Sequence, residues 1–313
     1  MAVRTLVILN PRSRGGAGAR LFAGVEASLR DALGPLEVER TRGPRDAERI
    51  AREGVRAGVE RLVVAGGDGT ASEVVAGLLG AGLTGYCQIG LLPLGTGGDL
   101  ARTLAMSTDL DDAVASLARG TLRVIDAGRA AFTTHEGTPR TSFFLNVASA
   151  GISGLVTELV NRAPKQLGGR ISFLIGTLRG IVRYGFPPVR VDADGVRLHE
   201  GPATLVAAGN GRYFGGGMAV APDARIDDGV LDVVVVPGFS RARLVRELPR
   251  IYRGTHIGVE GVEHCRATSV VLEPLSSEPV WIELDGEPVG RLPARFDVLP
   301  KAITLFGATA PAG

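Results

Sequence analysis

The sequence predicts an α/β N-terminal domain, in which a parallel sheet carries helices on both faces, followed by a mainly antiparallel β-sandwich domain. Three observations lead to this fold class. The chain has 313 residues, which is too long for one ordinary core. Strand-like and helix-like patterns alternate up to about residue 125. From about residue 189 onward, short strand-like segments with turn signals dominate.

The pattern changes between residues 121 and 126, and no Ser- or Pro-rich linker marks the change. We therefore expect one domain at 1–125 and a second at 126–296, packed closely with a cleft between them. The C-terminal segment 297–313 is expected to pack back on the first domain.

Hydrophobic periodicity locates the elements of the first domain. Apolar runs predict buried strands at 5–9, 36–40, 61–65 and 88–92. Helical spacing predicts helices at 19–33, 45–56, 71–79 and 109–118, and one that starts near residue 99. Because helices follow strands in turn, we expect parallel strands that are buried on both faces.

The second domain has a different pattern. Strands are expected at 121–132 and 141–147, and helices at 154–167, 170–184 and 241–252. Most segments after residue 189 are short strands separated by turn dipeptides: Asp194-Gly195, Asn210-Gly211, Asp228-Gly229 and Asp285-Gly286. This spacing is typical of an antiparallel sandwich.

Composition limits the function classes. The formal net charge is only +2, which gives no reason to expect a nucleic-acid partner. Two cysteines, Cys87 and Cys265, cannot form a disulfide framework, and this fits a reducing cytoplasm. The sequence shows no signal-peptide pattern and no uninterrupted apolar stretch of about 18 residues. We therefore expect a cytoplasmic protein without a membrane span.

A glycine-rich turn, 66–70, follows the strand at 61–65 and precedes a helix. Glycines allow a close backbone approach, and the start of a helix attracts anions, so the turn can hold phosphates. It is neither a Walker A loop nor a GxGxxG fingerprint. Asp68 would repel a phosphate unless a divalent cation, Mg²⁺, lay between them. The alternative is a tight turn in which Asp68 only caps the helix.

Two further turns follow strands of the same sheet. The turn 10–16 carries arginines and a hydroxyl that suit phosphate oxygens, and the turn 93–99 is rich in glycine and ends at Asp99. Ligands of open α/β sheets bind at the carboxyl ends of the strands. Three such turns at one edge therefore predict a nucleotide site.

These motifs resemble the diacylglycerol kinase catalytic domain, a family that includes bacterial lipid kinases and is similar to sphingosine and ceramide kinases. The resemblance rests on motifs that follow one another over nearly the whole chain: Asn10-Pro11, Gly66 to Thr70 with Glu73, Leu94-Gly95-Thr96, Asp99 to Arg102, Gly209-Asn210-Gly211, Gly215 to Met218, Ala221 to Ala224, Asp228-Gly229 and Asp285-Gly286-Glu287.

The resemblance implies a lipid kinase that transfers the γ-phosphoryl group of ATP to the hydroxyl of diacylglycerol or a related lipid. ATP would bind in the cleft, on the nucleotide-binding first domain, and the lipid on the second domain. The implied nucleotide contacts are Asn10, Pro11, Arg12, Ser13, Arg14, Thr41, Gly66, Gly67, Asp68, Gly69, Thr70, Ala71, Ser72, Glu73, Gly95, Thr96 and Asp285.

The resemblance also implies the catalytic groups and the metals. Glu287 would be the general base for the lipid hydroxyl, and Asp68 and Asp99 would hold the catalytic Mg²⁺. A second, structural Mg²⁺ or Ca²⁺ would bind the carboxylate of Asp228 and the carbonyls of Arg225 and Val230.

The chain departs from the family pattern at two positions, because Gly98 precedes Asp99 where the family usually has Asn, and Arg14 stands where a small residue is common. Spacing alone also allows simpler interpretations. Asp285-Gly286 and Asp228-Gly229 are both typical hairpin turns, and Glu287 beside the first would then be a solvated side chain.

Two other functions stay open. A nicotinamide-dinucleotide kinase has a similar glycine-aspartate turn, but Glu73 matches the lipid enzymes and no Asn-Glu pair typical of dinucleotide kinases is found. A non-catalytic nucleotide- or lipid-binding regulator on the same fold would have lost its catalytic carboxylates, whereas Asp68, Asp99 and Glu287 are all present.

The helix expected at 170–184 has an apolar stripe: Ile171, Leu174, Leu178 and Ile181. Such stripes usually face the core. Alternatively, the stripe lines the lipid pocket or meets a membrane surface transiently, with arginines at anionic headgroups: Arg170, Arg179 and Arg183. A lipid kinase would act peripherally at the membrane, as a monomer or a homodimer.

Overall fold

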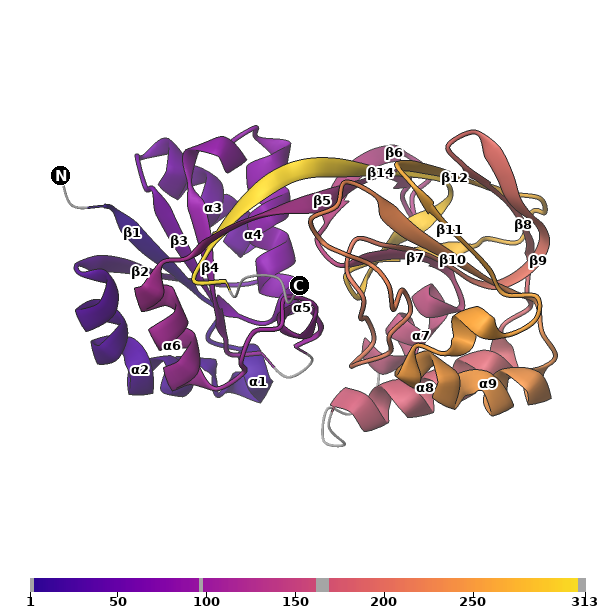
Figure 1. Ribbon diagram of the computed structural model, residues 1–313, viewed down its shortest axis with the longest axis horizontal. Helices are drawn as coiled ribbons and strands as arrows, with labels where there is room; N and C mark the ends of the chain where they lie inside the picture. Colours follow the sequence, from indigo (N-terminus) through magenta and orange to yellow (C-terminus); the bar gives the residue numbers. More distant parts are fainter. Residues whose placement is uncertain (1–2, 96–97, 162–168, 309–313) are drawn as a thin grey trace. The chain divides into compact units, whose positions relative to one another are not determined.

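Figure 1 shows the computed structural model, which describes residues 3–95, 98–161 and 169–308. The chain divides into two compact units. The first contains Met1–Asp126 and Lys301–Gly313, and the second contains Ala127–Pro300. Two strands, β5 (Leu122–Thr133) and β14 (Glu287–Phe306), continue from one unit into the other.

The first unit is built on a parallel sheet with the strand order β14-β4-β3-β1-β2. Its further elements are β1 (Thr5–Leu9), α1 (Ser13–Gly16), α2 (Gly18–Leu33), β2 (Leu36–Arg40), α3 (Asp46–Arg56), β3 (Arg61–Gly66), α4 (Asp68–Gly80), η1 (Thr84–Tyr86), β4 (Gln88–Pro93), α5 (Asp99–Thr103) and α6 (Leu110–Arg119).

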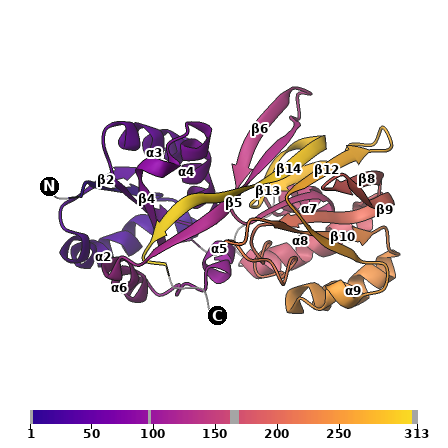
Figure 2. The same cartoon turned by 45° about the horizontal axis from the view of Figure 1, so that its top comes forward.

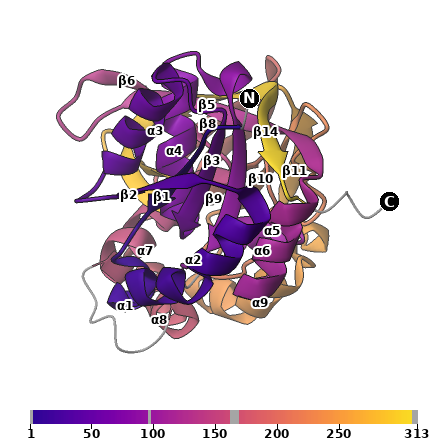
Figure 3. The same ribbon diagram turned by 90° about the vertical axis from the view of Figure 1, so that its left-hand side faces the viewer.

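Helices cover both faces of this sheet, because successive residues of a strand point to opposite sides. Val7 and Leu9 of β1 join a buried apolar cluster with residues of α2 and α6. On the other face, Leu6 lies against Gly54 of α3, where a Cβ would come within 2.7 Å of the leucine side chain. Figure 3 shows α3 and α4 on one side of the sheet and α2 and α6 on the other.

A buried carboxylate joins the two long strands within the first unit. Asp126, which is 1% exposed, accepts a hydrogen bond of 2.7 Å from the backbone N–H of Lys301. The end of β14 then pairs with β4 at Leu305, so the C-terminal strand completes the parallel sheet.

The second unit is rich in antiparallel strands. Its elements are the second half of β5, β6 (Pro139–Phe144), β7 (Val147–Gly151), α7 (Ile152–Asn161), α8 (Gly169–Arg183), β8 (Pro188–Ala193), β9 (Val196–Gly209), β10 (Leu231–Pro237), α9 (Arg241–Arg253), η3 (His256–Gly258), β11 (Glu263–Ala267), β12 (Ser269–Pro274), β13 (Trp281–Leu284) and most of β14. The strand pairs β5–β6, β7–β9, β7–β13, β8–β9, β8–β12, β9–β10, β10–β11, β12–β14 and β13–β14 are antiparallel.

Two apolar cores lie on opposite faces of β9. Val206 and Ala208 belong to a cluster formed among the strands. Leu205 and Ala207 belong to a second cluster, together with residues of α7, α8 and α9. The helices of this unit therefore pack on one face of the strand layer (Figure 1), while the β5–β6 hairpin stands out from it (Figure 2).

The prediction of a single strand at 141–147 is wrong, because β6 ends at Phe144 and a separate strand, β7, begins at Val147. The backbone N–H groups of Leu145 and Asn146 donate to the carboxylate of Asp285 instead of to a neighbouring strand. The expected helix at 154–167 is described as α7, Ile152–Asn161, and its predicted remainder lies outside the described residues.

Candidate active site

The turn 66–70 forms where β3 ends and α4 begins, and its glycines are needed for close packing. A Cβ on Gly67 would lie 3.1 Å from the Cα of Gly95, and a Cβ on Gly95 would lie 2.4 Å from the Cα of Gly67. The two turns therefore touch through their backbones. The N-cap of α4 is Gly67, and no side chain caps this helix, so Asp68 is not its N-cap.

The structure brings the two predicted metal-binding residues, Asp68 and Asp99, into contact through the backbone of one and the carboxylate of the other. The backbone N–H of Asp99 donates to Oδ2 of Asp68 at 2.8 Å. The Asp99 side chain is largely buried, and its Oδ1 accepts from the guanidinium of Arg102 at 2.6 Å. Asp68 is half-buried at the start of α4. Carboxylate oxygens in such a pair are the hard ligands that Mg²⁺ prefers.

The turn after β1 is tied to the other two turns. Nδ2 of Asn10 donates to the hydroxyl of Thr70 at 3.0 Å, and its Oδ1 accepts from the backbone N–H of Arg12 at 3.0 Å. The hydroxyl of Ser13 donates to the carbonyl of Asn10 at 2.9 Å. Arg14, with φ 48°, donates to the carbonyl of Gly95 at 3.3 Å. Three turns that are far apart in the sequence therefore form one cluster.

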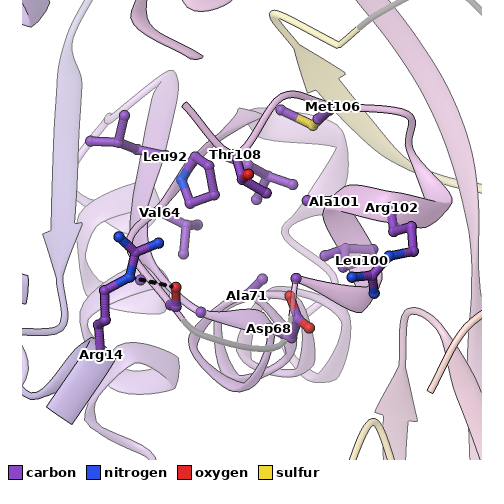
Figure 4. A pocket seen from close by; sticks show the side chains of 16 residues that line it. Arg14, Val64, Asp68, Ala71, Leu92, Leu100, Ala101, Arg102, Met106 and Thr108 are labelled. Atoms are coloured by element: carbon purple, nitrogen blue, oxygen red, sulfur yellow. Dashed lines mark hydrogen bonds between the residues drawn. The ribbon is translucent and has the colours of Figure 1, made fainter. Parts of the chain in front are cut away.

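A cavity of about 190 Å³ opens among these turns. Figure 4 shows Arg14 on one side, Asp68 and Arg102 on another, and the apolar side chain of Val64 between them; Leu92 also lines the cavity. The cavity thus combines an apolar wall with charged groups of both signs, as a nucleotide with a base and phosphates requires. The predicted contact Thr96 lies outside the described residues.

Two other predicted nucleotide contacts have partners within the first unit. The backbone N–H of Thr41, directly after β2, donates to the carbonyl of Leu9 at 2.9 Å. The carboxylate of Glu73 on α4 accepts from the N–H of Ala47 at 3.3 Å, in the first turn of α3. Burial raises the pKa of Glu73, and the backbone hydrogen bonds oppose that rise. These contacts favour a role for Glu73 in joining α3 to α4.

The remaining predicted residues of the cluster lie in the same turns. They are Pro11 after β1, Gly66 at the end of β3, and Gly69, Ala71 and Ser72 in the first turns of α4. Free N–H groups at the start of a helix favour an anion there.

In the second unit, the turn between β13 and β14 carries Asp285 and Glu287. Asp285 has φ 48°, and its carboxylate accepts from the backbone N–H groups of Leu145, Asn146 and Val147 at 2.7 to 3.1 Å. This geometry favours an anchoring role for Asp285 over the predicted nucleotide contact. Glu287 is exposed at the start of β14, as an accessible base requires.

Two family models match the chain. The diacylglycerol kinase catalytic domain matches residues 4–130, and the YegS C-terminal NAD kinase beta sandwich-like domain matches residues 146–307. The chain belongs to the diacylglycerol kinase family. The resemblance inferred from the motifs is thereby confirmed.

Relatives of this kinase family match over nearly their whole length. A diacylglycerol kinase of Mycobacterium tuberculosis is 30% identical over 305 residues, which cover 97% of this chain and 94% of the relative. A probable lipid kinase YegS-like of Xanthomonas oryzae pv. oryzae is 34% identical over 317 residues, with 96% and 97% covered.

Solved structures of two kinases share the fold. A diacylglycerol kinase from Bacillus anthracis str. Sterne gives a TM-score of 0.73 at 23% identity, covering 99% of this chain and 97% of that one. Yeast NADH kinase, complexed with NADH, gives 0.54 at 12% identity, with 98% and 83% covered. These similarities show the two-domain fold with a β-rich C-terminal domain.

The structural metal expected in the second unit of this kinase stays a prediction. Asp228 forms an ion pair with Arg266, and its Oδ1 accepts from the N–H of Val230 at 3.3 Å. Nearby Asp232 is buried, and burial raises its pKa against the opposing charges of Arg266 and His264. Within the described residues, no group of three or more His, Cys, Asp or Glu side chains could hold a metal ion.

One carboxyl group of this kinase was missed at the sequence level. Glu283 on β13 is 1% exposed; its Oε2 accepts from the hydroxyl of Thr157 at 2.8 Å and its Oε1 from the N–H of Gly286 at 3.2 Å. Burial raises the pKa of Glu283 to about 7. The available signal was a carboxylate inside a short apolar strand, Trp281–Leu284.

Proposed function

We propose that this protein is an ATP-dependent lipid kinase that transfers the γ-phosphoryl group of ATP to the hydroxyl of diacylglycerol or a related lipid. The observation that carries the proposal is the cluster of three turns at the carboxyl ends of β1, β3 and β4, with Asp68 and Asp99 joined inside it. Membership of the diacylglycerol kinase family supports the choice of a lipid alcohol as acceptor.

The turns suit the phosphates of ATP for two reasons. The start of α4 offers backbone N–H groups and the positive end of the helix dipole. Arg14 lines the same cavity and can pair with phosphate oxygens. The cleft expected from the sequence, with ATP on one domain and lipid on the other, belongs to this proposal.

A divalent cation fits the donor set of the first unit. Asp68 and Asp99 would hold Mg²⁺, because two carboxylates within one hydrogen-bonded unit supply oxygen ligands. When bound, this ion neutralises charge on the phosphates during transfer. Arg102, which pairs with Asp99, orients that carboxylate and limits its negative charge.

Glu287 is proposed as the general base that removes the proton of the lipid hydroxyl. Its exposure on β14 makes the carboxylate accessible, and such a base contributes about 10²- to 10⁴-fold to the rate. Its amide variant, Glu287→Gln, is expected to bind ATP but to lose most of the phosphoryl transfer. Glu260→Gln is a matched control, because Glu260 is an exposed residue outside this turn.

The assay uses labelled ATP with a total lipid extract, and mass spectrometry identifies the labelled product. Normal turnover by Glu287→Gln would remove Glu287 from the mechanism. The two other functions remain outcomes of the same assay: NADP formed from ATP and NAD would indicate a dinucleotide kinase. ATP binding without any phosphorylated lipid across a broad panel would indicate a regulator.

We also propose that a surface on α8 meets the membrane transiently. Leu174, Leu178 and Val182 are 40%, 38% and 68% exposed, and they repeat every fourth residue on one side of the helix. Arg179 and Arg183 beside them are exposed and suit anionic headgroups. We call these five residues the α8 face.

The predicted stripe on this helix is therefore only partly a core stripe. Ile181 is buried against α7 and α9, whereas Leu174 and Leu178 are exposed. The side chains of Arg170 and Ile171 lie outside the described part of the chain. No described helix is long and apolar enough to span a membrane.

A further inference from the structure

A group of buried polar side chains lies behind the turn that carries Glu287. On β7 and α7, the hydroxyl of Ser149 donates to that of Ser153 at 2.8 Å. On α7 and β13, Thr157 donates to Glu283, which accepts in turn from the N–H of Gly286. These four side chains are at most 5% exposed.

The helix α7 and the strand β13 pack closely against each other. A Cβ on Gly154 would lie 2.6 Å from the Cβ of Trp281, so a larger residue would push the helix away from the strand. Ser153 and Thr157 are four residues apart and share one face of α7. Ser149 and Glu283 are direct partners across β7 and β13, so their side chains lie on the same face of the sheet.

Stability alone does not account for a carboxyl group at this position. Burying a polar group without full compensation destabilises a protein, and buried ionic groups are often replaced by apolar ones without loss of stability. Glu283 shares its strand with the apolar residues Ile282 and Leu284. Its raised pKa, caused first by burial and then by the charges of Asp285 and Glu287, shows the same unfavourable environment for a charge.

The turn is held by carboxyl groups on both sides. Asp285 fixes the first part to the backbone of 145–147, through three N–H groups. Glu283 fixes the next peptide through the N–H of Gly286, a residue at φ 86°. That peptide joins Asp285 to Gly286, one residue before Glu287, so holding it restricts the path of the backbone from which the Glu287 side chain leaves.

We propose that Glu283 is a positioning residue for phosphoryl transfer, because its carboxyl group, oriented by Thr157, fixes the Gly286 peptide and thereby the general base Glu287. This inference rests on the proposed lipid kinase function for its effect on the reaction. The fixing of the turn itself does not depend on that function.

Two substitutions of Glu283 separate positioning from packing. Glu283→Gln keeps an acceptor for the Gly286 N–H and a partner for the Thr157 hydroxyl. Glu283→Leu removes both hydrogen bonds but keeps an apolar side chain of similar size in a buried site. Thr157→Val is a milder variant that removes only the hydroxyl donor, and it serves if the leucine variant does not fold.

The kinetic experiment measures kcat for lipid phosphorylation and KM for ATP. Glu283→Leu is expected to lower kcat by about tenfold to a hundredfold with an unchanged KM for ATP, since a base misplaced by about 1 Å has such an effect. Glu283→Gln is expected to restore kcat to near that of the unaltered protein. A leucine variant with an unchanged kcat overturns the inference.

Amide hydrogen exchange tests the same inference without any turnover. In Glu283→Leu, the N–H of Gly286 is expected to exchange on the order of tenfold faster, as the loss of one hydrogen bond implies, while Glu283→Gln stays protected. Equal exchange in all three proteins would overturn the positioning role. A protein that makes no lipid product, yet shows the expected exchange, would contradict the proposed function and not this inference.

Discussion

At the scale of single residues, the contact between Asp68 and Asp99 allows a substitution that changes the charge of the site but keeps its hydrogen bond. The Asp99 N–H donates to Asp68, and an asparagine at position 68 still offers an oxygen to that donor. The Asp68→Asn variant therefore keeps the hydrogen bond and loses the negative charge that a cation needs.

We expect Asp68→Asn to lower kcat by at least about a hundredfold, because the cation that would stabilise charge on the phosphates loses a carboxylate ligand. Its free energy of unfolding should change by less than about 1 kcal/mol. Steady-state assays and urea unfolding measure both quantities. Asp111→Asn, at an exposed position of α6, is the control that should change neither. Full activity of Asp68→Asn would exclude this carboxylate from the metal site.

Glu283 gives a prediction about stability and pH. Burial raises the pKa of Glu283 from its ordinary value of 4.5 to about 7 in the folded protein. The folded state therefore holds this proton more tightly than the unfolded chain. The stability that the neutral carboxyl group contributes is complete below the pKa of 4.5 in the unfolded chain. It falls as pH rises from that pKa toward the folded-state pKa, and it is lost above about pH 7.

The Glu283→Gln variant should lack this loss, which amounts to about 3 kcal/mol at most. Urea unfolding at about pH 5 and about pH 8 measures it in both proteins. The unaltered protein should lose more stability than the variant between these two conditions. An equal loss in both would mean that Glu283 is not the group responsible.

At the scale of elements, the α8 face makes the membrane proposal testable. Val182→Asp places a negative charge at a position that is 68% exposed, so folding should tolerate it. Binding to vesicles of anionic phospholipid should weaken by about fivefold to tenfold, because apolar contact is lost and like charges repel. Vesicle sedimentation measures this binding.

Val196→Asp is the matched control, because Val196 on β9 is 70% exposed and lies outside the α8 face. It should leave vesicle binding unchanged. Equal binding by both variants and the unaltered protein would show that the α8 face does not meet the membrane.

Local patterns predicted most elements but not their interruptions. The apolar run at 5–9 became β1, and the spacing at 241–252 became α9. The gap between β6 and β7 could not be predicted from local residues, because the acceptor for Leu145 and Asn146 is Asp285, far along the chain. The apolar stripe of α8 shows a second limit of prediction from sequence. Periodicity indicates which residues share one face of a helix, but it does not indicate whether that face is buried or exposed.

At the scale of the whole molecule, the two units follow the change of pattern in the sequence. The division after Asp126 lies beside the expected boundary at 125, and residues from Lys301 onward belong to the first unit. The order of strands and turns predicted that Asp68 and Asp99 lie at one edge of the sheet, because turns after parallel strands meet there. The contact between Glu283 and Thr157 could not be predicted from the sequence, because it joins β13 to α7 through tertiary packing that no local spacing encodes.

The measurement that tests the central claim most directly is the transfer of labelled γ-phosphate from ATP to diacylglycerol in vesicles, with NAD as the competing acceptor. The account predicts a labelled phospholipid from the unaltered protein and from Glu260→Gln, and almost none from Glu287→Gln. Label in NADP with none in lipid, or equal lipid labelling by Glu287→Gln, would contradict it.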